Sequence, residues 1–525
     1  MSSAIIDSSK FLSDPVFKVV SEVSASTGVR AFVIGGYVRD CFLGRNNDDI
    51  DIVVEGSGTE FAQAVASYID QVYYPEQGIT SKKPTKVSVF ENFGTAMLHF
   101  RGMEVEFVGA RKESYHRESR KPIVESGTLE DDQKRRDFTI NAMAFSLCKE
   151  DYGALVDPFG GISDLAQGII RTPLDPEVTF SDDPLRMFRA ARFATKLSTP
   201  EFCFTIVPEC LIAMREMADR ISILSKERIV EELCKILAED RPSIGLKILD
   251  ETTLLEKVLP QVTRLKGVET VEGRGHKDNF SHTLQVVDYL ASSEKEAIAE
   301  GLLKDYYPAQ DGQSTVGTVR TSPNVWLRWA GLLHDIGKPV CKRFDPVSGW
   351  TFHGHEVVGS RMVAKVFKDL KMPQNEKMKY VEKLVGLHHR PVALVDDQVT
   401  DSAVRRLIFD AGDDLDDLML LCNADITSKN PVKVKRLRHN FDLVKEKLKD
   451  VEQRDAIRNW KNPITGDYIM EVYGIEPCNT IGFIKERIKE AILDGKIGYT
   501  FEEADSMMRE IATEYGLSPK DAPKQ

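Results

Sequence analysis

The sequence lacks paired cysteines, long apolar runs and an excess of basic residues, and each absence excludes a class of protein. Its eight cysteines are scattered without a Cys-x-x-Cys pair, which argues against a zinc ribbon or a disulfide framework. No stretch approaches the ~18 apolar residues that a membrane span needs. Residues 1–10 contain neither an apolar signal core nor an arginine, so we expect no secretory or mitochondrial targeting. Together these absences predict a cytoplasmic protein without a membrane partner.

The balance of charge limits the partners that the whole molecule can bind. The net charge is −12 and the pI is about 5.5, so this is not a protein that coats nucleic acid. A polyanionic partner must therefore meet a local basic patch or bound metal ions. With 525 residues, 42% of them hydrophobic, the chain is predicted to form about three or four globular domains.

One stretch near the N-terminus carries the first chemical signal. Residues 31–34 predict a buried strand, and Gly35-Gly36 follows it, where glycine allows a sharp turn and close approach to the backbone. Asp49 and Asp51 alternate with isoleucine, so on a strand both carboxylates point to one face. Adjacent carboxylates repel each other unless a divalent cation lies between them. We therefore predict a metal site, against the alternative of a glycine turn and a polar strand end.

A third carboxylate is expected on a neighbouring strand. Residues 103–108 alternate in polarity, and Glu106 would lie beside Asp49 and Asp51 if the two strands pair. Three carboxylates form a set that can hold two metal ions. Glu104 lies on the same face, and the sequence does not choose between the two glutamates.

Two segments of mixed charge follow these strands. Residues 111–121 are polar and basic without a period, so we expect a loop. Arg135, Arg136, Asp137 and Asn141 are expected together at one helix start, an arrangement that suits triphosphate and ribose contacts. A capped helix with solvated charges would have the same pattern.

A turn at residues 157–161 separates this part from a predicted helical region. Asp183 is expected to cap a new helix, with Pro184 in its first turn. Asp183 and Arg186 are three residues apart and are therefore expected on one helix face. Residues 204–260 are predicted to be helical throughout.

Most of the histidines gather in one segment, since seven of the ten lie between residues 276 and 389. His334 and Asp335 end an apolar helix, where adjacent side chains can share one cation. The other expected ligands come from successive helices: His282, His355, His388 and Asp425. A lone histidine is usually structural, so the prediction of a metal centre depends on the whole set. Whether that centre is hydrolytic stays open.

A basic segment stands out in this acidic chain. Residues 429–449 carry eight lysines and arginines against two acidic residues. This composition predicts a polyanion-binding helix, although a solvated helix face would look the same.

Taken together, these motifs resemble the class II tRNA nucleotidyltransferases, the CCA-adding enzymes, which share a superfamily with bacterial poly(A) polymerases. Residues 35–40 with the Asp49–Asp51 pair match the family's metal motif, and residues 135–142 match its ribose- and phosphate-contacting motif. Residues 182–186 match its amino-acid template, although Asp182 stands where the family usually has Glu. The central part of the chain, up to about residue 430, resembles the HD domain that many bacterial members carry.

The resemblance implies an α+β fold: a small mixed β-sheet nucleotidyltransferase head, like the palm of DNA polymerase β, followed by an all-α remainder. The implied domains are a head over residues 1–155, a helical neck with nucleotide-selecting and RNA-binding helices over 156–265, an HD domain over 266–450 and a helical tail over 451–525.

The resemblance also implies an activity: template-independent addition of CCA to tRNA lacking all or part of it, from CTP and ATP, with two Mg²⁺ ions. The implied catalytic residues are Asp49, Asp51 and Glu106, and the implied nucleotide-binding residues are Gly35, Gly36, Arg39, Arg136, Asp137, Asn141, Asp183, Arg186, Arg189 and Arg192. The HD domain would bind a transition metal or Mg²⁺ through His282, His334, Asp335, His355, His388 and Asp425. The RNA-binding hypothesis rests on Lys433, Lys435, Arg436 and Arg438.

Two alternatives stay open at this stage. The chain could be a poly(A) polymerase or add only part of CCA, but residues 89–95 lack the Gly-Arg-Arg-Phe-like stretch of bacterial poly(A) polymerases. The basic segment 111–121 argues weakly against a CC-only enzyme. In the second alternative the HD domain is the working part, as a metal-dependent phosphohydrolase of a 2′,3′-cyclic phosphate or a nucleotide. The oligomeric state is not determined by the sequence.

Overall fold

The structure is a computed structural model that describes residue 8 and residues 10–79, 83–90, 94–114, 123–276, 278–308, 315–396, 400–426, 431–455, 458 and 460–520. The chain divides into two compact units. Unit 1 comprises Met1–Ile236 and Ile244–Val258, and unit 2 comprises Leu237–Ser243 and Leu259–Gln525. Each unit has its own buried core. The predicted division into four domains stays a prediction.

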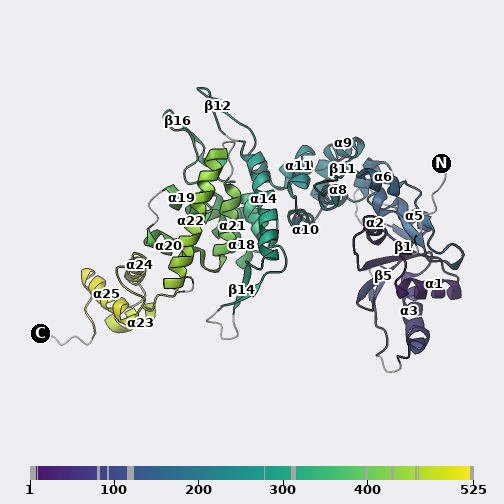
Figure 1. The fold of residues 1–525 in the computed structure, drawn as a ribbon, viewed down its shortest axis with the longest axis horizontal. Coiled ribbons are helices and arrows are strands. Elements are labelled where there is room, and N and C mark those ends of the chain that lie inside the picture. Colours follow the sequence, from purple (N-terminus) through teal and green to yellow (C-terminus); the bar gives the residue numbers. More distant parts are fainter. Residues whose placement is uncertain are drawn as a thin grey trace. The chain divides into compact units, whose positions relative to one another are not determined.

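A seven-stranded mixed sheet lies at the centre of the first part of unit 1 (Figure 1). In spatial order its strands are β3 (Val87–Phe90), β4 (Thr95–Phe100), β5 (Met103–Gly109), β2 (Asp49–Val54), β1 (Ala31–Ile34), β8 (Ala144–Ser146) and β9 (Leu155–Val156). β2 and β5 pair in parallel, and the other neighbouring pairs are antiparallel. This sheet and the mainly helical remainder confirm the predicted α+β class.

Helices on the sheet hold the strand ends that carry the carboxylates. α1 (Pro15–Thr27) begins where the Asp14 carboxylate accepts the amide of Val16. α3 (Gly58–Tyr68) packs on β4 and β5. Its start can approach the sheet this closely because residue 58 is a glycine: a Cβ there would lie only 2.9 Å from the Phe107 carbonyl oxygen. All four residues of β1 are fully buried, as the apolar run predicts.

The remaining helices of unit 1 cover the sheet and continue into a helical region. They are α2 (Gly36–Phe42), α4 (Tyr74–Glu76), α5 (Leu129–Lys134), α6 (Gly161–Gln167), α7 (Pro176–Asp182), α8 (Leu185–Leu197), α9 (Pro208–Glu216), α10 (Lys226–Leu237), α11 (Ser243–Glu251) and α12 (Leu254–Val258). The predicted turn at residues 157–161 is present. The Asp157 carboxylate stabilises it by accepting hydrogen bonds from the amides of Gly161 and Ile162.

Two predictions of local structure in the head were wrong. The segment expected as a loop over 111–121 begins with β6 (Arg111–Ser114), which pairs with β7 (Ile123–Ser126), because backbone pairing outweighs polar composition. Residues 115–122 lie outside the described part. Arg135 and Arg136 follow the end of α5 instead of starting a helix, since a capping box at Thr128 and Asp131 starts that helix earlier.

Two further corrections concern the helical region. The expected helix over 204–260 is interrupted at its start by β11 (Thr205–Ile206), which pairs with β10 (Ile169–Ile170). Pro184, not Asp183, holds the N-cap position of α8, although the Asp183 carboxylate still accepts the Leu185 amide at 3.1 Å. Asp183 thus retains a capping contact from one position earlier.

Unit 2 is largely helical, with short two-stranded ribbons. Its helices are α13 (Pro260–Thr263), α14 (Asn279–Ala299), α15 (Val325–Leu333), α16 (Lys338–Cys341), α17 (His355–Asp369), α18 (Glu376–Leu387), α19 (Arg390–Asp396), α20 (Asp401–Ala411), α21 (Leu415–Asp425), α22 (Pro431–Asp455), α23 (Gly466–Tyr473), α24 (Asn479–Leu493) and α25 (Phe501–Glu514). The ribbons are β12 (Thr270–Val271) with β13 (Arg274–Gly275), β14 (Lys304–Pro308) with β15 (Thr315–Val319), and β16 (Arg343–Asp345) with β17 (Gly349–Thr351). α22 runs unbroken past residue 450.

Among the described residues, no helix has both the length and the apolar composition that crossing a membrane requires.

Candidate active sites

The first site lies where β2 and β5 run side by side. Their parallel register places Asp51 opposite Glu106 and Asp49 opposite Glu104. Glu104 is exposed and lies 4.0 Å from His99, while Glu106 is partly buried and acts electrostatically on Asp51. The geometry therefore favours Glu106 as the third carboxylate, a choice that the sequence left open.

Asp51 is the carboxylate that this environment perturbs most. Burial raises its pKa to about 6, and the charges of Asp49 and Glu106 act in the same direction. The Arg136 guanidinium opposes the shift. A divalent cation stabilises a desolvated carboxylate that has other negative charges beside it. Asp49, Asp51 and Glu106 are therefore a set of ligands that fits bound metal ions.

Gly35 explains how Arg136 comes close to this group. Gly35 has a φ of 81°, and a Cβ there would lie 2.7 Å from Nη1 of Arg136 and 3.7 Å from Oδ2 of Asp51. Arg136 also donates to the Asn141 carbonyl at 3.3 Å. Any side chain at position 35 would therefore displace the guanidinium that faces the carboxylates. Gly36 begins α2 immediately afterwards.

Asp137 is buried beside the first site and is held by two partners. Its carboxylate accepts from Arg189 Nε at 2.7 Å and from Asn141 Nδ2 at 3.0 Å. Burial alone would raise the pKa of Asp137, but Arg189 and Asn141 lower it below its usual value. Asp137 is therefore a fixed anion.

Several of these residues line a cavity of about 310 Å³ within unit 1. Its walls are Arg135, Arg136, Asp137, Asp183, Leu185, Arg186, Arg189 and Arg228. Arg186 donates to the carbonyls of Thr179 and Arg135, and Arg228 donates to Asp183 Oδ2 at 3.0 Å. Asp183 and Arg186 are thus each positioned by a third group and both face the cavity, as a fixed acceptor and a fixed donor.

Two predicted nucleotide-binding arginines lie outside that cavity. Arg39 is buried, donates twice to Asp40 and once to Asn141, and stacks on Phe193. Arg192 pairs with Glu232 at 3.0 Å. Arg39 therefore contacts Asn141, which in turn binds Asp137, whereas the ion-pair partner of Arg192 is not among the cavity's walls.

Asp132 is a residue of this site that sequence reasoning missed. It is fully buried, and its two carboxylate oxygens accept from Arg135 Nε at 2.9 Å and from Arg136 Nε at 3.2 Å. The signal was the spacing, because an acid three or four residues before an arginine lies within its reach on a helix. Here α5 ends just before both arginines, and the contacts to Asp132 still form. Asp132 therefore holds both cavity-lining guanidinium groups.

The second site lies within unit 2, where helix ends converge. His282 comes from α14, His334 and Asp335 follow α15, His355 begins α17, His388 follows α18 and Asp425 ends α21. The structure brings all six predicted ligands together. His282 Nε2 lies 2.7 Å from Asp425 Oδ1, and His334 Nε2 lies 3.2 Å from Asp335 Oδ2.

Three imidazoles of this site are oriented by the same kind of local hydrogen bond. In His334, His355 and His388, Nδ1 lies 2.7–2.9 Å from the carbonyl of the residue three positions earlier. Nδ1 therefore carries a proton, and Nε2 points to the centre, where its lone pair is available whenever the ring is neutral. All three Nε2 atoms and Asp335 Oδ1 are buried without a hydrogen bond of good geometry. Such orphaned lone pairs fit metal ligation.

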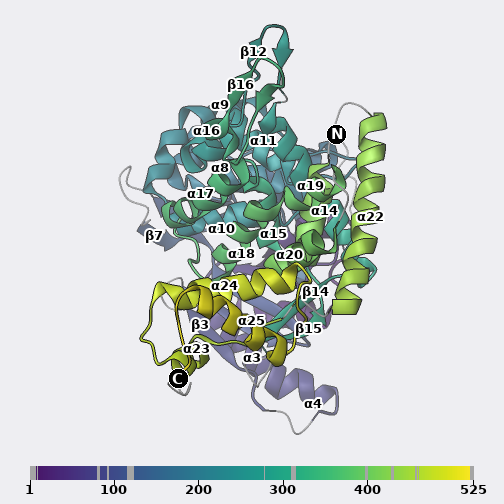
Figure 2. The same ribbon diagram turned by 90° about the vertical axis from the view of Figure 1, so that its left-hand side faces the viewer.

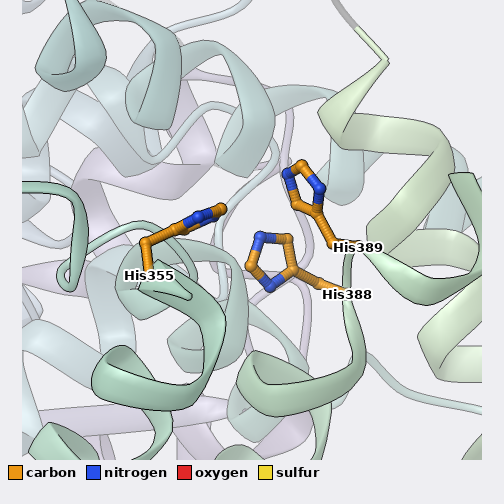
Figure 3. Close-up of side chains that lie close together, drawn as sticks. All are labelled: His355, His388 and His389. Atoms are coloured by element: carbon orange, nitrogen blue, oxygen red, sulfur yellow. The ribbon is translucent and has the colours of Figure 1, made fainter. Parts of the chain in front are cut away.

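The ligands form two groups on either side of Asp335. His282, His334 and Asp425 make one group, and His355, His388 and His389 make the other, each within 4.8 Å. Figure 3 shows His355 reaching from the start of its helix toward the two adjacent histidines. His389 was not among the predicted ligands, although its position next to His388 was a signal.

Burial and neighbouring charges shift the pKa values of the histidines in this centre. Burial alone would lower the pKa of His334, but Asp335 and Asp425 raise it to about 10. Burial and the charge of His334 lower the pKa of His388 to about 3. Without a metal, a proton on His334 neutralises the carboxylates, which is the role a cation would take. Gly337 permits this packing, since a Cβ there would lie 2.1 Å from the His355 carbonyl oxygen.

The predicted basic segment falls on α22. Lys435, Arg436 and Arg438 are exposed, and Arg438 lies over the ring of Tyr289. The side chain of Lys433 lies outside the described ones. The other three side chains are therefore open to solvent.

Three families match consecutive parts of the chain. Residues 31–171 match the family described as "Poly A polymerase head domain", residues 203–266 match "Probable RNA and SrmB- binding site of polymerase A", and residues 279–416 match "HD domain". The first match contains the carboxylate site. The third contains every ligand of the histidine site except Asp425, which lies beyond its end.

Curated relatives extend these matches. The A-adding tRNA nucleotidyltransferase of Aquifex aeolicus is 37% identical over 231 residues, which are 44% of this chain and only 26% of that protein. The A-adding enzyme of Deinococcus radiodurans is 30% identical over 394 residues, covering 74% of this chain and 80% of its own. The Multifunctional CCA protein of Vibrio parahaemolyticus is 30% identical over 412 residues, covering 76% of this chain and 85% of that protein.

A solved structure shares the fold. The CCA-adding enzyme of Thermotoga maritima in complex with tRNA aligns with a TM-score of 0.55 at 21% identity, covering 97% of this chain and 98% of that one.

Proposed function

The chain belongs to the tRNA nucleotidyltransferase and poly(A) polymerase family, and on that premise we propose that it adds CCA to the 3′ end of tRNA. The substrates would be CTP, ATP and tRNA lacking all or part of CCA, and pyrophosphate would be released. One observation carries the proposal: a cavity with a fixed Asp–Arg pair lies in the same unit as three converging carboxylates. A cytoplasmic location belongs to the same proposal.

The catalytic roles follow from the geometry of unit 1. Asp49, Asp51 and Glu106 would hold two Mg²⁺ ions. Bound there, the ions would lower the pKa of the RNA 3′-hydroxyl and stabilise charge on the leaving pyrophosphate. Arg136 would contact the triphosphate, and its position beside Gly35 and Asp51 supports this role.

Base selection is assigned to Asp183 and Arg186. Cytosine and adenine both present an amino donor next to a ring-nitrogen acceptor, whereas guanine and uracil present a carbonyl next to an N–H. A fixed acceptor beside a fixed donor complements the first pair and opposes the second. Leaving such groups unpaired rejects the wrong base by orders of magnitude.

A base-competition assay tests this assignment. We expect Arg186→Ala to lose its preference for CTP and ATP over GTP and UTP more than it loses metal binding. Lys196→Ala is the matched control, because Lys196 is a basic residue on the same helix, exposed and outside the cavity. If Arg186→Ala still rejects GTP and UTP as well as the parent, the assignment is wrong.

A-addition alone is a second candidate, because two relatives that match this chain are named A-adding enzymes. Three tRNAs, lacking CCA, CA or A, separate the candidates when each is incubated with single nucleotides and its end is sequenced. CTP incorporation on the first tRNA supports CCA addition. Incorporation of ATP only, and only on the last tRNA, would establish A-addition. Long A-tails would indicate a poly(A) polymerase.

A second activity is proposed for the histidine site: metal-dependent hydrolysis of a phosphate ester such as a 2′,3′-cyclic phosphate or a nucleotide. The orphaned Nε2 atoms and the two ligand groups around Asp335 support it. Asp335 would help to hold the metal beside both histidine groups, since its oxygens lie 3.2 Å from His334 Nε2 and 3.4 Å from His355 Nε2. In the reaction a water oxygen bonds to phosphorus, the ester P–O bond breaks, and the alcohol leaves with a proton.

Phosphate-ester hydrolysis by the full chain tests this second activity. We expect turnover of 2′,3′-cyclic AMP in the presence of at least one divalent transition metal, and its loss in Asp335→Ala. Absence of turnover with Mg²⁺, Mn²⁺, Co²⁺, Ni²⁺ and Zn²⁺ alike would refute it, without affecting the nucleotide-addition proposal.

A further inference from the structure

The first residue of β2, Asp49, lies beyond the end of the neighbouring strand β1. The pairing of β1 with β2 stops at Ile34 and Asp51, two residues short of Asp49. On the other side, Asp49 lies opposite Glu104 of β5. One of the proposed metal ligands is therefore flanked by a strand on one side only. Such a ligand needs a further contact to fix the direction of its carboxylate, because metal binding depends on the geometry of the ligands.

The side chain of Asn47 supplies that contact. Its Oδ1 accepts a hydrogen bond from the backbone N–H of Asp49 at 3.0 Å. A side-chain oxygen that bonds the backbone two residues further on closes a turn, which restricts the backbone of Asp48 between them. Asn47 therefore takes the place of β1 as the partner of this strand end.

Asn47 is itself anchored to a buried ion pair. Its Nδ2 donates to Asp40 Oδ2 at 2.8 Å, and Asp40 is buried. Arg39 holds Asp40 in turn with hydrogen bonds of 2.8 and 2.9 Å. A carboxylate paired with a guanidinium only accepts hydrogen bonds, so it selects the nitrogen side of the amide and leaves Oδ1 facing Asp49. The orientation of the Asn47 amide is thus determined from both sides.

The anchor is rigid because Arg39 has partners on every side. Its Nη1 donates to Asn141 Oδ1 at 2.7 Å, and its guanidinium lies 5.3 Å from the centre of the Phe193 ring. Only 4% of Arg39 is exposed. All these residues belong to unit 1, so the whole series of contacts from Arg39 to Asp49 lies within one compact body.

We propose that Asn47 is a positioning residue for metal binding, which directs the carboxylate of Asp49 toward the other two carboxylates and uses the Arg39–Asp40 pair as its fixed point. The inference rests on the proposed nucleotide addition and assigns to it a residue that touches neither metal nor substrate. Loss of such a support leaves the ligand present but poorly directed. It therefore weakens metal binding and leaves the rate at saturating metal intact.

The Mg²⁺ dependence of nucleotide addition provides the first test. We expect Asn47→Ala to raise the Mg²⁺ concentration for half-maximal addition about tenfold, the low end of the effect of residues that orient metal ligands. At saturating Mg²⁺ its kcat should match that of the parent. Asn46→Ala is the matched control and should behave as the parent, because Asn46 is an exposed asparagine of the same loop. A parental Mg²⁺ dependence in Asn47→Ala would overturn the inference.

An exchange of residues tests the anchor. Asn47→Asp keeps an acceptor for the Asp49 amide but sets its carboxylate against that of Asp40, so we expect weaker Mg²⁺ binding. Adding Asp40→Asn restores an amide opposite a carboxylate, and the double variant should bind Mg²⁺ better than Asn47→Asp alone. Losses that simply add in the double variant would show that the two side chains act independently, which contradicts the anchoring.

Amide hydrogen exchange of the metal-free full chain tests the contact itself. A peptide spanning residues 46–54 should gain about one fast-exchanging amide in Asn47→Ala, because the Asp49 amide loses its acceptor. The same peptide in Asn46→Ala should exchange as in the parent. Unchanged exchange in Asn47→Ala would refute the contact and the proposal with it.

Mn²⁺ binding, followed by electron paramagnetic resonance without nucleotide, measures the metal site independently of catalysis. The histidine site of unit 2, where α18 packs on α15 and α17 (Figure 2), would take up Mn²⁺ as well. Parent and variants therefore all carry Asp335→Asn in this measurement. We expect Asn47→Ala to weaken the remaining Mn²⁺ binding about tenfold. An unchanged affinity would overturn the inference.

These readouts separate the inference from the activity on which it rests. If the parent adds no nucleotide to tRNA, but Asn47→Ala exposes the Asp49 amide and weakens Mn²⁺ binding, the positioning role stands and the proposed function fails. If the parent adds CCA, and Asn47→Ala changes neither the amide exchange nor the metal dependence, the proposed function stands and the positioning role fails.

Discussion

The two candidate metal sites of this protein are built in opposite ways. In unit 1, carboxylates project from neighbouring strands, and Asp49 remains exposed. In unit 2, imidazoles converge from helix ends, and each of three is fixed by a bond from Nδ1 to a carbonyl. Open oxygen ligands suit Mg²⁺, which keeps water and arrives with phosphates, while buried nitrogen ligands suit transition metals. The difference predicts two independent chemistries with different metal demands.

The sharpest way to break this comparison is to disable each site separately. We expect Asp51→Asn to reduce nucleotide addition roughly 1,000-fold or more, because the metal ligand that stabilises the transition state is lost. Hydrolysis of 2′,3′-cyclic AMP should remain. Asp335→Asn should have the reverse effect. A single variant that abolishes both activities, while the chain still melts at the parental temperature, would contradict the independence of the sites.

Metal removal should separate the sites as well. After dialysis against EDTA, we expect Mg²⁺ alone to restore nucleotide addition fully but to restore less than about a tenth of the hydrolysis. Metal analysis of the purified protein should find a transition metal that His388→Ala loses. Equal restoration of both activities by Mg²⁺ would show that the nitrogen ligands do not set metal preference.

A third prediction concerns Asp132, which orients Arg135 and Arg136. We expect Asp132→Asn to lower kcat/KM for nucleotide addition about 10- to 100-fold, mainly through KM for the nucleotide, because a neutral amide binds two guanidinium groups less tightly. Asp132→Glu should recover part of the loss. Glu130→Gln, exposed on the same helix, is the control and should be silent. A loss confined to thermal stability would assign Asp132 a purely structural role.

The pH dependence of nucleotide addition should reflect Asp51. Its pKa is raised to about 6, so below that pH the protonated form predominates and cannot bind a cation. We expect addition to fall as the pH drops through about 6, and higher Mg²⁺ to move the midpoint downward. Rates measured from pH 5 to 8 at two Mg²⁺ concentrations check this. A midpoint that ignores Mg²⁺ would point to another group.

The smallest expected effect concerns the basic face of α22. Replacing Lys433, Lys435, Arg436 and Arg438 together by alanine should weaken tRNA binding a few-fold and reduce its salt slope. Neither hydrolysis nor selection between CTP and GTP should change. The surface has no part in tRNA binding if affinity and salt slope both stay at the parental values.

Prediction from the sequence succeeded where a local pattern was sufficient. The strand before Gly35, the alternation of Asp49 and Asp51 and the apolar helix before His334 all have a period that identifies their structure. It failed at residues 111–114 and around Arg135, where polar composition concealed a strand and an earlier helix start. Those two features depend on a distant pairing partner and on a cap several residues upstream.

The residue types in the sequence were enough to predict the chemical groups of both sites: acids on a strand, histidines near helix ends, and an Asp and an Arg at one helix start. Their assembly depends on tertiary contacts. The parallel register of β2 and β5 selects Glu106 over Glu104, burial makes Asp51 the perturbed carboxylate, and the packing of helix ends adds His389 to the histidine centre. Register, burial and convergence are relations between segments far apart in the chain, so no local pattern could have defined them.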